Sequence, residues 1–110
     1  MSVRETEEID YIYLEEPAHR PVLVVSDPLG WKPPDEREHI ELLRQKLNSQ
    51  IVFVSSGQIE KVWPDWKGEE PVMIEVAAQH SLTRPAAEFY AQAEEVLDEA
   101  GIRLRFTLLA

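Results

Sequence analysis

Four residues between positions 27 and 39 have side chains that could bind a ligand or a metal ion: Asp27, Trp31, Glu36 and His39. Asp27 ends an aliphatic run, and open α/β sheets commonly bind ligands at the carboxyl ends of their strands. Glu36 and His39 are three residues apart, which puts both on one side of a helix. Two carboxylates and an imidazole could coordinate a hard metal ion or act as a general base. We therefore expect Asp27, Glu36 and His39 to converge, with Trp31 as a lid or stacking wall.

A structural role for the same residues is the alternative. Asp27 would accept hydrogen bonds from backbone amides in the turn, as aspartate commonly does. Glu36 would interact with the positive end of a helix, and Trp31 would cover the edge of the core. Such residues are common where a strand passes into a helix, so both interpretations stay open.

No other catalytic motif occurs in the sequence. There is no H-E-x-x-H, no G-x-S-x-G and no glycine-rich phosphate loop, and the chain has no cysteine. His19 and His80 fall in expected loops or strand ends and are expected to be exposed. We therefore expect a protein that is not an enzyme and has no cofactor.

Two further pairs of residues are candidates for a protein interface. Trp63 and Trp66 lie in an expected loop, where tryptophans either cover the core or bind a partner. Arg103 and Arg105 alternate with apolar residues on the last expected strand, which indicates a sheet face that is solvated or forms a dimer interface.

The periodicity of apolar residues predicts six main elements and one short helix. Expected strands cover residues 9–16, 22–26, 71–78 and 102–109; one helix runs from Asp35 through Val54, a short helical turn follows Gly57, and a second long helix runs between Thr83 and Gly101. The main elements have the order β-β-α-β-α-β. Right-handed crossovers that step the same way put both long helices on one face. We therefore predict an α/β (or α+β) two-layer sandwich with a mixed sheet of about four strands and two helices on one face.

The segment 51–55 has an alternative interpretation. Its sequence, IVFVS, has strand propensity, and a helix ending near Asn48 would free it to form a strand. The stripe of Ile40, Leu43, Leu47, Ile51 and Val54 continues at helical spacing without a glycine, so we favour the continuous helix.

Length and composition indicate one small acidic domain. Residues 1–8 are polar and are expected to form a flexible tail, and residues 9–110 a single globular domain. The formal net charge of −10 disfavours nucleic acids and anionic membranes as partners. A protein partner or a homodimer remains, and the absence of a signal peptide or long apolar run suggests the cytoplasm.

The sequence also resembles a family of small uncharacterised bacterial proteins, a domain of unknown function. The resemblance rests on an aliphatic strand ending in Ser26-Asp27, on Trp31, on a helix opened by Glu38-His39, and on Trp63-Pro64. It covers residues 9–109 and implies no activity or catalytic residue. We therefore expect a non-enzymatic interaction or self-association module. The alternatives are a small-molecule or metal site at residues 27–39 and an immunity-like neutraliser of a basic partner.

Overall fold

The computed structural model describes residues 2–6, 8–17, 19–32, 35–64, 66, 68 and 71–109. Its elements follow the predicted order, with the short helix after Gly57 as α2. Their bounds are β1 (Tyr11–Glu15), β2 (Arg20–Asp27), α1 (Asp35–Ser55), α2 (Gln58–Val62), β3 (Val72–Ala78), α3 (Arg84–Glu99) and β4 (Ile102–Leu108).

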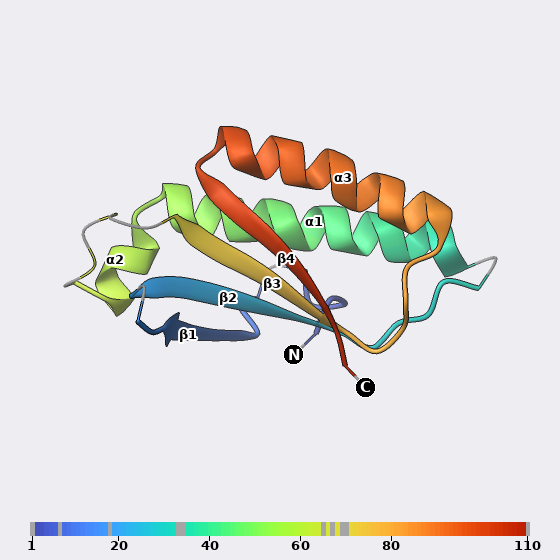
Figure 1. The fold of residues 1–110 in the computed structure, drawn as a ribbon, viewed down its shortest axis with the longest axis horizontal. Coiled ribbons are helices and arrows are strands. Elements are labelled where there is room, and N and C mark those ends of the chain that lie inside the picture. Colours follow the sequence, from blue (N-terminus) through green and yellow to red (C-terminus); the bar gives the residue numbers. More distant parts are fainter. Residues whose placement is uncertain are drawn as a thin grey trace.

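The strands form one mixed sheet in the order β1-β2-β3-β4. β1 pairs with β2 in antiparallel fashion, while β2, β3 and β4 are parallel. Each parallel connection passes through a long helix, and Figure 1 shows α1 and α3 together on one side of the sheet. The predicted α/β two-layer sandwich is therefore confirmed.

The core lies between this sheet and the two long helices. Alternate strand residues point toward the helices, because successive side chains of a strand face opposite ways. Fully or almost fully buried aliphatic residues come from both layers: Leu23, Val25, Ile74, Val76, Ile102, Leu43, Leu47 and Leu97. None of the helices in the described part of the chain is long and apolar enough to cross a membrane.

α1 runs without interruption through the segment whose conformation the sequence left open. Residues 51–55 are helical, so the alternative strand at this position is wrong. Ile51 and Val54 pack against the core from one side of the helix, which outweighs a strand propensity worth less than about 1 kcal/mol per residue. The helix ends at Ser55, and Gly57 follows with a φ of 84°, a left-handed conformation that glycine adopts without strain.

The first residues of the chain pack against the domain, whereas the sequence led us to expect a flexible tail. Val3 is completely buried in the core, and its amide donates a hydrogen bond to the Ser26 carbonyl at 2.9 Å. One apolar residue in a polar segment is a weak signal, which explains why the sequence did not reveal this contact.

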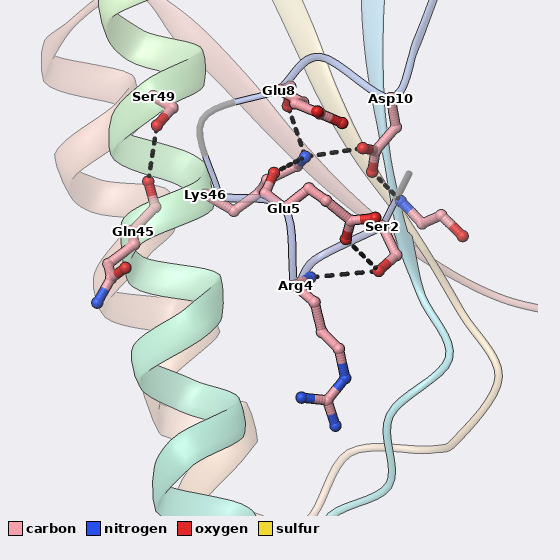
Figure 2. Close-up of polar contacts among 9 residues, drawn as sticks. Ser2, Arg4, Glu5, Glu8, Asp10, Gln45, Lys46 and Ser49 are labelled. Carbon is pink, nitrogen blue, oxygen red and sulfur yellow. Dashed lines mark hydrogen bonds and ion pairs between the residues drawn. The ribbon is translucent and has the colours of Figure 1, made fainter.

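Lys46 of α1 holds this segment in place. Its Nζ donates to the Glu5 carbonyl at 2.7 Å and to the Glu8 carbonyl, and it lies 2.7 Å from Asp10 Oδ1 (Figure 2). Lys46 is fully buried, so all three of its donors are satisfied inside the protein. The second Asp10 oxygen accepts from the Ser26 amide at 3.0 Å, which links the same cluster to β2.

Replacing Lys46 by methionine tests this clamp. The substitution keeps the length of the side chain but leaves the buried Asp10 carboxylate without its cation, so we expect a loss of about 3–5 kcal/mol in the free energy of unfolding. Urea titration measures this loss. Lys61→Met, at an exposed position of α2, is the control and should change it by less than about 0.5 kcal/mol. Equal midpoints for the two variants would contradict the proposed clamp.

Candidate functional site

Asp27 and His39 form a buried pair at the carboxyl end of β2. His39 Nε2 lies 2.7 Å from both Asp27 carboxylate oxygens, and each residue is 1% exposed. Trp31, from the loop between β2 and α1, stacks on the imidazole with ring centroids 3.6 Å apart and an interplanar angle of 15°. The structure thus brings together three of the four residues predicted to form this site.

The remaining polar atoms of the pair are also engaged within the chain. His39 Nδ1 lies 2.9 Å from the Gly30 carbonyl oxygen, and the Leu29 amide donates to Asp27 Oδ1 at 3.2 Å. Both ring nitrogens therefore already have an oxygen partner. These contacts join the end of β2, the loop after it and the first turns of α1.

Glu36 does not join this group. Its Oε2 accepts a hydrogen bond of 2.7 Å from Thr83 Oγ1, and Thr83 is the N-cap of α3. Glu36 and His39 both lie in the first turns of α1, as their spacing predicts. The hydrogen bond from Thr83, however, directs the Glu36 carboxylate toward the start of α3 and away from Asp27. Within the described residues, no three histidine, aspartate or glutamate side chains are arranged to hold a metal ion. The expected ligand set of Asp27, Glu36 and His39 is therefore not assembled.

A pocket of about 390 Å³ lies beside the Trp31–His39 stack. Its walls come from the first residues of the chain, the loop after β2, the first turns of α1 and the loop after β3. The lining residues are Arg4, Leu29, Gly30, Trp31, Lys32, Asp35, Glu38, His39, Leu42 and His80. In Figure 1 the loops that leave β2 and β3 run from the same end of the sheet, and the Gln79 amide donates to the Asp27 carbonyl at 3.1 Å.

Of the lining residues, only Trp31 and His39 were anticipated as site residues. Lys32, Asp35 and Glu38 lie within the segment 27–39, whereas Arg4 and His80 come from other parts of the sequence. His80 follows the end of β3, and Asp27 ends β2. Because the carboxyl ends of neighbouring parallel strands lie at the same edge of a sheet, the topology could have predicted that the two residues are close. Nothing in the sequence indicates Arg4, because its position depends on the Lys46 contacts. Its side chain points away from the Lys46 cluster (Figure 2). His19, by contrast, is exposed and lies 3.0 Å from Glu16.

Trp63 and Trp66, predicted as interface anchors, are partly buried and pack against the core cluster. Within this chain, both tryptophans therefore cover the core, which is the alternative that the sequence left open. Arg103, the third interface candidate, is exposed and forms an ion pair with Asp98 at 3.1 Å.

Arg105, the fourth interface candidate, belongs to a polar network on the sheet face opposite the helices. Its guanidinium donates to Tyr13 Oη at 3.2 Å and to Glu15 at 3.1 Å, and its Nε lies 3.3 Å from Glu75 Oε2. The Thr107 hydroxyl donates to the same Glu75 oxygen at 2.7 Å. Burial by itself raises the pKa of Glu75, but the Thr107 hydrogen bond and the charge of Arg105 outweigh it, and the pKa is lowered overall.

This network should make stability depend on acid pH. Because the pKa of Glu75 is lower in the folded chain, its ionised form stabilises the fold above the ordinary pKa of 4.5, and this contribution is lost as the pH falls below that value. We expect Glu75→Gln to be less stable than wild type at pH 7 and the difference to shrink by pH 3. Thermal unfolding at both pH values measures it. A constant difference would show that Glu75 ionisation does not contribute.

The buried pair can be tested by a double-mutant cycle with Asp27→Leu and His39→Leu. Each single change leaves the other side chain buried without its ionisable partner, so we expect each to cost about 3–5 kcal/mol. The double variant should lose less than the sum of the two, because both polar groups are then removed. Urea unfolding of the four proteins measures the coupling. Strictly additive losses would contradict a direct interaction.

Comparisons with known proteins identify the family of the chain. No curated protein and no solved structure matches the chain. The family model described as "Family of unknown function (DUF6572)" matches residues 1–110. The resemblance read from the sequence to a domain of unknown function is thereby confirmed, and the chain belongs to the DUF6572 family.

Proposed function

We propose that this protein is a non-catalytic binding module whose ligand is a small polar molecule held in the pocket beside Trp31 and His39. The observation that carries the proposal is the meeting of Arg4, Lys32 and His80 in one concave site, although they come from three distant parts of the sequence. The site lies at the carboxyl ends of β2 and β3, where parallel sheets commonly bind ligands.

The charges of the pocket indicate which chemical groups the ligand carries. Among the described residues, Arg4 and Lys32 form no ion pair, whereas Arg44, Arg84 and Arg103 each pair with a carboxylate. Two unpaired cations in a chain of net charge −10 favour an anionic group such as a carboxylate.

Asp35 and Glu38 line the same pocket from the first turn of α1. They would repel a purely anionic ligand and favour a positively charged or hydrogen-bond-donating group. The mixture of charges therefore supports a small zwitterion, such as a free α-amino acid, over an inorganic anion.

A binding role without catalysis agrees with the state of the Asp27–His39 pair. Both imidazole nitrogens contact protein oxygens, an arrangement that suits a histidine with a structural role better than a general base. The pair instead fixes the Trp31 ring and the loop that carries Lys32.

Thermal unfolding in the presence of single compounds tests the proposal. The probes are the individual free amino acids, with acetate, inorganic phosphate and methylamine as partial ligands. A ligand at ten times its Kd stabilises the folded chain by about 1.4 kcal/mol, which raises Tm by a few degrees. We expect at least one amino acid to do so in a dose-dependent way and the partial ligands to have little effect.

Charge-neutralising variants locate the binding. Lys32→Gln and Glu38→Gln should each weaken the binding of that amino acid by about tenfold or more, since each removes one charge-assisted contact. Lys61→Gln and Glu94→Gln, at exposed positions outside the pocket, are matched controls and should bind as wild type does. If no probe raises Tm, or if the controls weaken binding as much, the proposal is wrong.

Association with another protein, the first expectation from the sequence, is favoured by a different feature. An apolar groove lies between the two long helices, away from the pocket.

A further inference from the structure

The groove between α1 and α3 has a volume of about 350 Å³ and a mainly apolar lining. Leu47 and Ile51 contribute from α1, and Phe89, Ala93 and Val96 contribute from α3. Val96, one of the lining residues, is 58% exposed, and exposed apolar side chains gathered in a groove are typical of interaction sites.

The groove exists because the apolar stripe of α1 is not aligned with its buried face. The stripe is centred near Leu47, but the fully buried side includes His39, Lys46 and Gln50. At about 100° per residue, these two directions differ by roughly 80°. Part of the stripe therefore faces α3 instead of the sheet, and Ile51 remains only partly buried.

A row of acidic side chains borders the groove on α3. Glu88, Glu95 and Glu99 follow one another at intervals of seven and four residues, so they lie along one side of the helix, next to Val96 and toward solvent. Glu88 pairs with Arg84 at 3.4 Å, but Glu95 and Glu99 form no ion pair with another described residue. On the opposite wall, Arg44 is already paired with Glu41 at 3.2 Å.

We propose that this groove binds a basic amphipathic helix of a partner protein. The apolar face of such a helix would cover Ile51, Phe89 and Val96, and its lysines or arginines would pair with Glu95 and Glu99. Helix-in-groove binding uses apolar anchors at intervals of three and four residues, which suits an elongated trough between two parallel helices. This binding is independent of the pocket beside Trp31.

Charge decides between a basic partner and a second copy of the chain. A second copy would bring its own Glu95 and Glu99 and a net charge of −10 to the contact. Like charges brought together at an interface oppose binding. A basic helix instead neutralises the row and gains from attraction before contact.

Selection of displayed peptides on the full-length protein tests the proposal. The library consists of helical peptides with varied charge and varied spacing of apolar residues, and binders to the Val96→Arg variant are removed by counter-selection. We expect the enriched peptides to carry lysine or arginine beside apolar residues at helical spacing. A peptide of the same composition in scrambled order should bind at least tenfold more weakly.

Matched variants then separate binding in the groove from general attraction to an acidic surface. Glu95→Gln with Glu99→Gln should weaken the selected peptide about tenfold at low salt. Glu94→Gln with Asp98→Asn, on the other side of α3, removes the same formal charge and should have less than a twofold effect. Amide chemical shifts should change mainly at Leu47, Ile51, Phe89 and Val96.

Several outcomes would overturn the inference. Enriched peptides that are acidic, that bind Val96→Arg as well as wild type, or that respond equally to the two charge variants would exclude the groove as the binding site, and so would failure to enrich any peptide. A concentration-dependent dimer in sedimentation that Val96→Arg abolishes would assign the groove to a second copy instead.

Discussion

The hydrogen-bonded pair of Asp27 and His39 fixes the relation between sheet and helix at the end of the molecule where the pocket lies. Removing a carboxylate and an imidazole from water is costly, and the cost is offset only when every polar atom finds a partner. Here the Leu29 amide and the Gly30 carbonyl complete the set. These bonds hold the loop after β2 against the first turns of α1. The stacked Trp31 and the neighbouring Lys32 are placed by the same contacts.

Much of the fold could be predicted from periodicity, because the strands and helices repeat apolar residues at their own intervals. The rotation of α1 could not. An apolar stripe predicts which side of a helix is buried. In α1 the buried side also includes Lys46 and Gln50, so the helix is rotated away from the orientation that its stripe predicts. A buried lysine requires several acceptors at once. Two of them are backbone carbonyls in a segment without sequence periodicity, so no local pattern could reveal the contact.

The candidate site was predictable to the extent that it depends on topology. Asp27, Trp31 and His39 meet because a parallel strand, a short loop and a helix start are adjacent in the sequence. Glu36 was misplaced because its partner, Thr83, is distant in the sequence and becomes a neighbour only when α3 packs beside α1. Helical spacing restricts the side from which a residue projects. The hydrogen-bond donor it meets there depends on tertiary packing.

The small number of positively charged side chains affects both the pocket and the groove. The chain has 11 lysines and arginines for 21 acidic residues. Several of these cations are engaged inside the fold: Lys46 holds the start of the chain, and Arg105 crosses the open face of the sheet. Each of these cations neutralises at least one carboxylate within the fold, so the surplus of acidic side chains lies on the rest of the chain. Arg4 and Lys32 form no ion pair with another described residue, so they create a local region where an anionic group is less strongly repelled. Glu95 and Glu99 on α3 likewise have no cation partner among the described residues. One composition thus supports two opposite preferences, an anionic group in the pocket and a basic helix at the groove.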